Sequence, residues 1–391
     1  MSTTLFTFLG RPSQEQAGKG GYRKTRYEFS DGDRSEEVAF LGWPLQKRLR
    51  PKRMVIMGTA GSSWDHVFEG DLDFAANAEQ ARETLIQAVH SGLVGRALLE
   101  PLERPLSEHI GCETRLVLIP YCRTEEEQVE LLRIMAEHVA ESDEVDIDVT
   151  HGFRHLPMIA LLAALHLQVV RKAEVRNIWY GEFDPDTAKA SVHNLVGLLR
   201  IADWLQALHT YEKDGDYSVF APLFGRPGVL LDRAAFFERT INPVKAREAL
   251  STWSSSLNRI PSGDPAALLF RDELESRVSW FRRDDRALWE KELAWCYLRQ
   301  RDYLRAAIFA LEAAISRNVR DEAGAQIGDY DARSQAKDDL IRMGNEHFRA
   351  LNSLRNALVH GARPKGWIEA ALQDETQLRA RLEELLSQIE V

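Results

Sequence analysis

The sequence predicts an α/β domain followed by an all-helical domain, and three observations indicate this order. Short apolar runs alternate with amphipathic stretches from the N-terminus to about residue 184, as in a sheet with helices packed on it. Beyond Asp184 no convincing β-branched run recurs, and the apolar residues keep a helical period as far as Val391. The 391 residues also exceed what one hydrophobic core usually serves. We therefore expect one domain over residues 1–190 and a second over residues 191–391.

The first domain is predicted to be a Rossmann-like parallel sheet with helices on both faces. Strands that alternate with helices pair in parallel through right-handed crossovers. Residues 22–29, followed by the turn signal Asp31-Gly32, are instead predicted to form a hairpin arm outside the parallel core. Buried strands are predicted at residues 4–9, 54–57, 115–121, 145–149 and 176–180, and helices between them at residues 76–93, 124–140 and 156–172.

The second domain is predicted to be helical throughout. Its apolar residues recur with the spacing of amphipathic helices, and the glycines and proline of residues 225–228 mark one of the loops. Helices are predicted at residues 192–209, 243–255, 287–300, 303–317, 338–359 and 369–390.

The composition excludes several classes of protein. With 44% hydrophobic and 28% charged residues, the chain can bury a core along most of its length, which excludes wholesale disorder. The formal charge of −10 argues against a broad basic surface for nucleic acid, so any such contact must be local. Without a signal peptide or an apolar run of about 20 residues, a cytoplasmic location is expected. The cysteines lack the pairing of a disulfide framework or a zinc site and are expected to pack in the core: Cys112, Cys122 and Cys296.

A glycine-rich loop, residues 58–65, directly follows a predicted strand. Open α/β sheets bind ligands at the carboxyl ends of their strands. Two glycines let backbone N–H groups approach an anion, and Thr59, Ser62 and Ser63 add hydroxyls. The Gly-Lys-Ser/Thr ending of a Walker loop is missing. The alternative is a plain strand-to-helix turn, in which Ser63 or Asp65 caps the next helix.

Residues 148–157 repeat this arrangement at the end of another strand. If the two strands are adjacent, the two loops form one pocket. Thr150, His151, Arg154 and His155 offer a hydroxyl, two imidazoles and a guanidinium, which suit phosphates and adenine edges. The alternative is a metal site, because His151 and His155 have the spacing of a zinc pair. However, the glutamate of an HExxH motif is missing, and a helix need not have begun there.

Two further motifs are candidates for function. Gly10 and Arg11 follow the first strand, where the glycine permits close backbone approach and the arginine could meet a phosphate. In the helical half, Arg355 and Asn356 precede His360 on a helix predicted to end just after that histidine. Arg355 and His360 are separated by about 7.5 Å along the helix axis and about 140° around it, so one helix does not bring both onto one bond. Two copies facing across a two-fold axis would do so. The alternative is a surface arginine and a C-terminal histidine without a catalytic role.

In this order, the motifs resemble those of the CRISPR-associated ribonucleases that join a CARF sensor domain to a HEPN nuclease domain. The resemblance spans nearly the whole chain, and residues 148–157 are its most specific motif. It includes Phe8-Leu9-Gly10 and residues 22–29, 58–65, 148–157 and 355–360, whereas residues 200–340 carry no motif that matches. In that family the CARF domain dimerises and binds a cyclic oligoadenylate made by a type III CRISPR complex on detecting foreign RNA. Binding switches on the HEPN dimer.

The resemblance implies a function and a set of site residues. It implies a metal-independent endoribonuclease that forms a homodimer or higher homo-oligomer, is activated by cyclic oligoadenylate and cleaves single-stranded RNA. His360 would act as general acid or base, Arg355 would stabilise the scissile phosphate, and Asn356 would orient one of them, leaving 2′,3′-cyclic phosphate and 5′-hydroxyl ends. The implied sensor residues are Gly10, Arg11, Thr59, Ser62, Ser63, Asp65, Thr150, His151, Gly152, Arg154 and His155.

Two other functions are compatible with the same residues. A ring nuclease would degrade cyclic oligoadenylate within the CARF domain, using Thr150, His151 or Arg154. A non-catalytic regulator would bind the ring and contact protein or DNA without cleaving RNA. Product analysis with the nucleotide alone, and with RNA, separates these two functions from the first.

Overall fold

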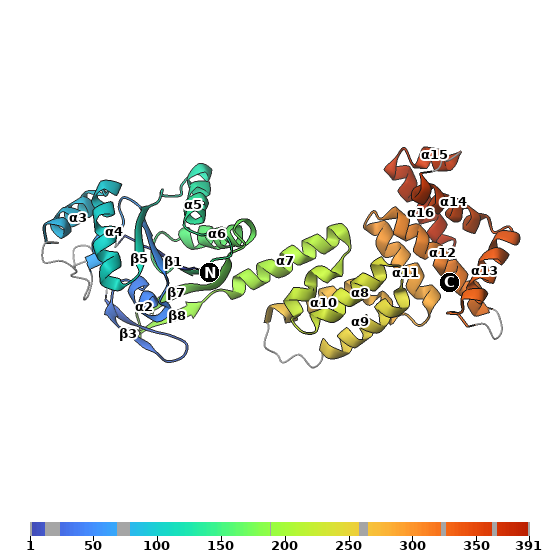
Figure 1. Cartoon of the computed structure of the whole chain (residues 1–391), viewed down its shortest axis with the longest axis horizontal. Coiled ribbons are helices and arrows are strands. Elements are labelled where there is room, and N and C mark those ends of the chain that lie inside the picture. Colours follow the sequence, from blue (N-terminus) through green and yellow to red (C-terminus); the bar gives the residue numbers. More distant parts are fainter. Residues whose placement is uncertain are drawn as a thin grey trace. The chain divides into compact units, whose positions relative to one another are not determined.

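The computed structural model describes residues 2–11, 24–68, 79–187, 189–257, 265–321, 326–361 and 366–389. The chain divides into two compact units, Met1–Arg200 and Ile201–Val391, whose elements are labelled in Figure 1. The first unit holds a mixed, mostly parallel sheet, and the second is helical in its described residues, so the predicted α/β domain followed by an all-helical region is confirmed. Residues 22–23 and 76–78, which begin a predicted arm and a predicted helix, lie outside the described residues.

The sheet combines a parallel core with antiparallel strands at one side. Its strands are β1 Thr3–Phe8, β2 Thr25–Glu28, β3 Arg34–Val38, β4 Arg53–Gly58, β5 Glu113–Leu118, β6 Glu144–Asp148, β7 Glu174–Asp184 and β8 Lys189–Asn194. They lie in the order β3-β2-β8-β7-β6-β1-β4-β5. From β7 to β5 all neighbours are parallel. β8 is antiparallel to β7. The predicted hairpin forms from β2 and β3 and extends the same sheet, because β2 pairs in parallel with β8.

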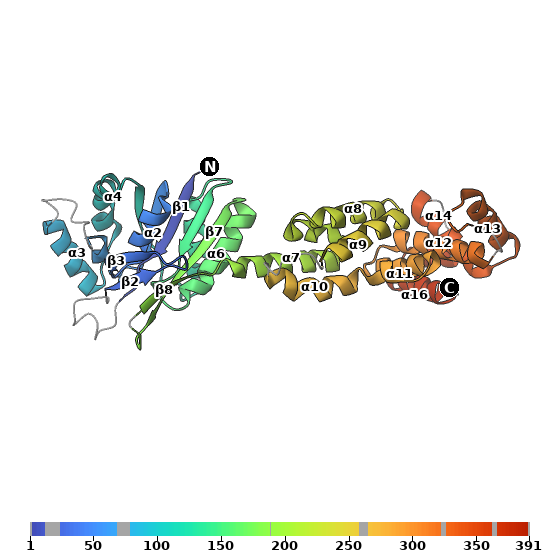
Figure 2. The same cartoon turned by 90° about the horizontal axis from the view of Figure 1, so that it is seen from below.

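Helices cover both faces of this sheet. They are α2 Gly42–Leu49, α3 Glu79–Ser91, α4 Arg96–Ile110, α5 Glu125–Glu137 and α6 Leu156–Val170. Successive residues of β1 point to opposite faces, so Leu5 shares a core with α2, α3 and α4, and Phe6 shares another with α5 and α6. Figures 1 and 2 show α3 and α4 on one side of the strands and α5 and α6 on the other.

The end of the first unit differs from the prediction. The helix expected from residue 192 begins at Gly197, as α7 Gly197–Asp214, and the residues before it form β8. Ala190 and Val192 are buried in β8 while the residues beside them are exposed, and this period of two is that of a strand. The chain divides into its two compact units between Arg200 and Ile201.

The second unit packs its helices around one core that includes Trp204 and Trp253. The helices are α8 Gly228–Arg239, α9 Pro243–Leu257, α10 Pro265–Arg277, α11 Arg286–Arg299, α12 Tyr303–Asp321, α13 Tyr330–Arg342, α14 Glu346–His360, α15 Trp367–Ala371 and α16 Glu375–Ser387. The single helix predicted over residues 338–359 is two helices, because Gly344 has a φ of 76° and the Asn345 side chain caps α14. Asp374 caps α16 in the same way, which divides the helix predicted over residues 369–390.

A buried carboxyl lies inside this helical core. Glu238 of α8 is 5% exposed and accepts hydrogen bonds from the hydroxyls of Tyr217 at 2.9 Å and Tyr297 at 2.5 Å. The Arg305 guanidinium lies 4.3 Å from the centre of the Tyr297 ring. Burial raises the pKa of the Glu238 carboxyl, because the charged form is costly in a core.

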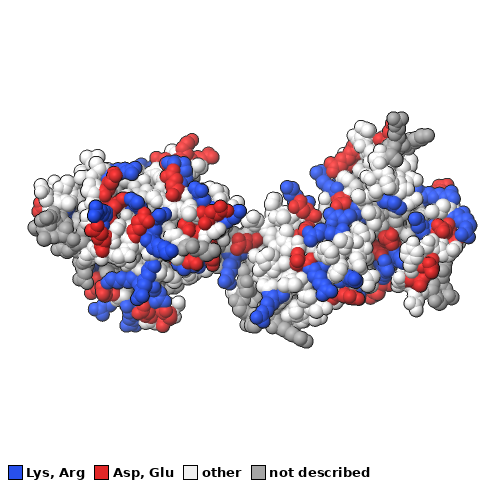
Figure 3. Space-filling model, in the orientation of Figure 1, with Lys and Arg blue, Asp and Glu red and all other residues white. Residues whose placement is uncertain are grey.

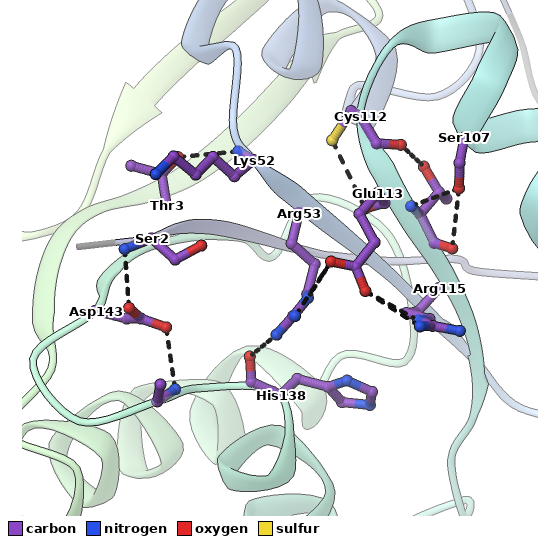
Figure 4. A network of polar contacts seen from close by, with 12 residues as sticks. Ser2, Thr3, Lys52, Arg53, Ser107, Cys112, Glu113, Arg115, His138 and Asp143 are labelled. Atoms are coloured by element: carbon purple, nitrogen blue, oxygen red, sulfur yellow. Dashed lines mark hydrogen bonds and ion pairs between the residues drawn. The ribbon is translucent and has the colours of Figure 1, made fainter.

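Polar contacts tie the amino ends of the parallel strands together. Figure 4 shows the Arg53 side chain, at the start of β4, donating to Glu113 at 3.2 Å and to the carbonyl of His138 at 3.0 Å. In the same view, the Ser2 N–H donates to Asp143 at 2.9 Å. This end of the sheet is thus occupied by ion pairs and backbone contacts.

The outer strand β5 has two of its backbone donors occupied by side chains of α4. The Thr114 N–H donates to the Ser107 hydroxyl at 2.8 Å, and the Leu116 N–H donates to the Glu103 carboxylate at 2.8 Å. Since β5 is last in the strand order, these donors face away from β4. The side chains of α4 therefore cover part of the sheet edge.

Candidate functional site

The loops predicted to bind a ligand lie at one edge of the sheet. They follow β6, β1 and β4, which are consecutive, parallel strands. The loops after β4 and β6 were expected to be neighbours if their strands were adjacent, but β1 lies between those strands. The end of β1 instead places Gly10 against the loop after β4, where the Ser63 N–H donates to the Gly10 carbonyl at 2.9 Å.

The loop after β4 is held by its own hydroxyl groups. Thr59, Ser62 and Ser63 are each 2% exposed. The Ser62 hydroxyl accepts a hydrogen bond from the Thr59 N–H at 2.9 Å and donates to the carbonyl of Leu9 at 2.9 Å. The loop is therefore fixed to the end of β1 by the same side chain that was predicted to face a phosphate.

The buried Trp64 side chain also holds this loop in place. Its indole N–H donates to the Thr59 carbonyl at 2.9 Å, and the side chain is fully buried. A Cβ atom at Gly58 would lie 2.8 Å from the Trp64 ring, so glycine is needed there. Asp65 follows in a short 3-10 helix, Trp64–Phe68, and its Oδ1 is buried without a hydrogen-bond partner among the described residues.

Replacing Ser62 by alanine is expected to destabilise the first unit by about 1 to 3 kcal/mol, because the buried Thr59 N–H and Leu9 carbonyl lose their partner. Urea unfolding measures this loss. Ser63→Ala is the matched control: the side chain is equally buried, but its contact to Gly10 is made by the backbone N–H and survives the substitution. Equal losses in the two variants would contradict the role given to the Ser62 hydroxyl.

The loop after β6 begins with a partly buried turn. The Thr150 N–H donates to Asp148 at 3.0 Å, and the Thr150 hydroxyl accepts from the Gly181 N–H of β7 at 2.8 Å. Gly152 has a φ of 114°, and a Cβ there would lie 2.9 Å from Leu156. A glycine at this position thus lets the loop turn closely into α6.

The two histidines of this loop are held by different neighbours. His151 Nε2 accepts a hydrogen bond from the Leu41 N–H at 3.2 Å. His155 Nε2 lies 3.0 Å from the Tyr121 carbonyl oxygen. They do not share a helical turn, because α6 begins at Leu156, and the zinc-pair geometry of a helix is therefore not formed. Arg154 between them is exposed.

A fourth loop joins this edge and was not predicted. Tyr121 follows β5, and its ring contacts the Phe153 ring with centroids 5.8 Å apart. A Cβ at Gly61 would lie 3.1 Å from the Tyr121 hydroxyl and 3.6 Å from the Arg11 guanidinium, so both groups flank the glycine-rich loop. The sequence signal was available: Tyr121 stands at the carboxyl end of a parallel strand, but it was assigned to the strand itself.

The motif of Arg355, Asn356 and His360 occupies the end of α14. His360 is exposed in the last turn, and the helix ends at Gly361, which has a φ of 55°. Arg355 and Asn356 are half-buried, and the Arg355 guanidinium donates to Asn352 at 3.1 Å. Within one chain, the arginine is thus held against its own helix while the imidazole points to solvent.

Comparison with known proteins identifies the first unit. Residues 4–184 match the family described as the CARF domain of the CRISPR system endoribonuclease Csx1. The first unit is a CARF domain. The β1, β4, β5 and β6 loops described above therefore lie at the carboxyl edge of a CARF sheet.

Two individual proteins are also similar to the chain. The CRISPR-associated protein MJ1674 of Methanocaldococcus jannaschii is 19% identical over 223 residues, which is 52% of this chain and 35% of that protein. The chain thus spans about a third of this curated relative. The structure of Enterococcus italicus Csm6 bound to cyclic hexa-2′-fluoro-hexa-dAMP matches with a TM-score of 0.34 and 11% identity, over 100% of this chain and 94% of that one.

Three further sequence expectations concern the cysteines, a metal site and a membrane span. Cys112 and Cys122 are buried and Cys296 is partly buried; all three are free, and burial raises the pKa of each thiol to about 11. Within the described ranges, no group of three or more His, Cys, Asp or Glu side chains is arranged to hold a metal ion. Among the helices of the described residues, none combines the length and apolar character needed to cross a membrane.

Proposed function

We propose that this chain is an endoribonuclease of type III CRISPR defence, activated by cyclic oligoadenylate and independent of metal ions. It would cleave single-stranded RNA at a site shared by the second units of two copies. The observation that carries the proposal is the CARF match over residues 4–184, because the family it names is that of an endoribonuclease. The arginine and histidine of α14 supply the groups that RNA cleavage needs.

The carboxyl edge of the CARF sheet offers groups suited to a ring of adenylates. Arg11 and Arg154 are exposed cations for phosphates. The Tyr121 and Phe153 rings are surfaces on which adenine can stack. Charged and stacking groups together fit a nucleotide ring better than an apolar ligand.

The homodimer is supported by an apolar surface on α6, the helix that follows the Thr150–His155 loop. Met158, Leu162 and Val169 are 71%, 58% and 66% exposed, and their spacing puts them on one face of the helix. A row of exposed apolar side chains is typical of a surface that another protein covers. A second copy seated on this face would bring two sensor loops close together.

Replacing Leu162 by arginine is expected to raise the dissociation constant of the dimer at least about tenfold. A charged side chain loses the apolar contact, and a loss of about 1.4 kcal/mol of binding free energy corresponds to that factor. Sedimentation equilibrium measures it. Leu93→Arg is the control, since Leu93 is 75% exposed near the end of α3, away from this face. Unchanged association of the Leu162 variant would contradict the α6 interface.

The nuclease chemistry needs an acid, a base and a cation near one phosphodiester. The 2′-hydroxyl of RNA gives its proton to a base and attacks phosphorus, and the 5′-oxygen leaves with a proton from an acid. The imidazoles of two His360 side chains, one from each copy, can fill both roles. Arg355 would stabilise the negative charge that builds on the phosphorus oxygens, and Asn356 would orient one of these groups. The products carry 2′,3′-cyclic phosphate and 5′-hydroxyl ends.

The charge distribution supports a small RNA site. On the face drawn in Figure 3, acidic and basic side chains lie interspersed over the CARF domain. The chain has 60 acidic against 50 basic residues. Binding over a long stretch of RNA is therefore disfavoured, and weakly specific contact at the cleavage site is what we expect.

The experiment incubates the full chain with labelled single-stranded RNA in EDTA, with and without cyclic tetra- or hexa-adenylate. The proposal expects cleavage only when a ring is present, with cyclic phosphate ends. Cleavage that requires Mg²⁺ would overturn the metal-independent mechanism. Loss of the ring without RNA cleavage would indicate a ring nuclease instead, and ring binding without either reaction would indicate a non-catalytic regulator.

A further inference from the structure

A buried carboxyl group lies directly beneath the sensor loops. Asp148 is the last residue of β6 and is 0% exposed. It accepts a hydrogen bond from the Thr7 hydroxyl of β1 at 2.6 Å and another from the Thr150 N–H at 3.0 Å. One side chain therefore joins the neighbouring strand to the first residue of the loop.

The connection continues to the strand on the other side. The Thr150 hydroxyl accepts from the Gly181 N–H of β7, and a Cβ at Gly181 would lie 3.0 Å from the Thr150 methyl group. A chain of contacts thus links β1, β6 and β7 near the sensor loops, through Thr7, Asp148, Thr150 and Gly181. Loss of the carboxyl would leave a hydroxyl and an amide N–H without their acceptor in a buried place, which costs more than the bonds contribute when made.

We propose that Asp148 is a positioning residue of the sensor site: it holds Thr150 and the loop that follows in the form that binds the nucleotide ring. This inference rests on the proposed function. Asp148 does not contact the ring, because it is fully buried behind Thr150. Its effect on binding is exerted through the geometry of the loop.

Asp146 provides a matched control within the same strand. It lies two residues earlier on the same face of β6, is also 0% exposed, and is held by Arg176 and by the Asn177 amide at 2.6 Å. Its partners belong to β7 and not to the ligand loops. Removing either carboxyl disturbs a buried polar cluster, but only Asp148 is bonded to the loop.

The test measures binding of cyclic tetra- and hexa-adenylate to the full chain by calorimetry. Asp148→Ala is expected to weaken binding at least tenfold, and Asp146→Ala to leave it unchanged. Asp148→Asn should restore binding, because its Oδ1 accepts from the Thr150 N–H and its amide donates to the Thr7 hydroxyl. If Asp148 only stabilised the fold, Asp148→Ala and Asp146→Ala would lose the same affinity. Asp148→Asn would then regain affinity only as far as it regained stability.

A second variant and a second readout keep the inference testable if Asp148→Ala does not fold. Thr7→Val keeps the shape of the side chain, removes one donor to Asp148, and should weaken binding by a smaller factor. Hydrogen exchange of the Thr150 and Gly181 amides should speed up in Thr7→Val and not in Asp146→Ala. Equal binding and equal exchange in these variants would overturn this inference alone. A wild-type chain that binds neither ring would overturn both the inference and the proposed function.

Discussion

Replacing His360 by alanine is expected to lower RNA cleavage by about 10³-fold, because a proton donor or acceptor in the transition state typically contributes a factor of this size. The side chain is exposed at the end of α14, so its removal leaves no cavity and the fold should be kept. Ring binding should not change. Cleavage is measured with labelled RNA at saturating cyclic oligoadenylate.

The same helix offers a matched control. His347 is also exposed, but it lies in the first turn of α14, about 20 Å along the axis from His360. His347→Ala is expected to cleave at the wild-type rate. Full activity of the His360 variant, or equal losses in both variants, would show that the chemistry lies elsewhere.

Replacing Glu238 by leucine is expected to destabilise the helical unit by about 2 to 4 kcal/mol, because two buried tyrosine hydroxyls lose their acceptor. Glu238→Gln should recover most of this loss, since its carbonyl accepts from one hydroxyl and its amide donates to the other. Urea unfolding at neutral pH separates these variants. Glu383→Leu is the control, because Glu383 is half-exposed on α16 and forms a surface ion pair with Arg379. Its change should stay within about 0.5 kcal/mol.

The same carboxyl predicts a dependence of stability on pH. Burial raises the pKa of Glu238 in the folded chain above its value in the unfolded chain. Between these two pKa values the folded chain binds more protons, so the contribution of Glu238 is full below the unfolded pKa and is lost as the pH rises through the folded pKa. The stability of the wild type relative to Glu238→Gln should therefore fall as the pH rises from the unfolded pKa of a glutamate through the raised folded pKa of Glu238. A difference that rises with pH would contradict the raised pKa.

The parallel core could be predicted because β1 and β4 are buried on both faces and read as nearly continuous apolar runs. Helix α4 could not be predicted from the same pattern, since Pro101 and Pro105 lie in its interior, where proline removes backbone donors. The helix still forms because it buries one apolar face against the sheet. The buried residues of that face are Leu99, Leu102 and Leu106.

The loops of the candidate site could be predicted from the sequence, but the strands and side chains that lie beside each loop could not. Residues that follow a parallel strand reach the same edge of the sheet, and this rule places Gly10, Thr59 and Thr150 together. Strand order is not written in the sequence, so the position of β1 between β4 and β6 became known only from the structure. The contact between Thr150 and Gly181 joins the loop after β6 to a residue of β7, and no local pattern signals it.

The α4 side chains that bind the outward N–H groups of β5 limit how the chain can assemble. Open-ended fibres grow when the free margin of one sheet templates a strand from the next molecule, and this needs vacant amide donors. Glu103 and Ser107 already satisfy two such donors. Even in concentrated protein, polymers should therefore not grow by strand addition at β5.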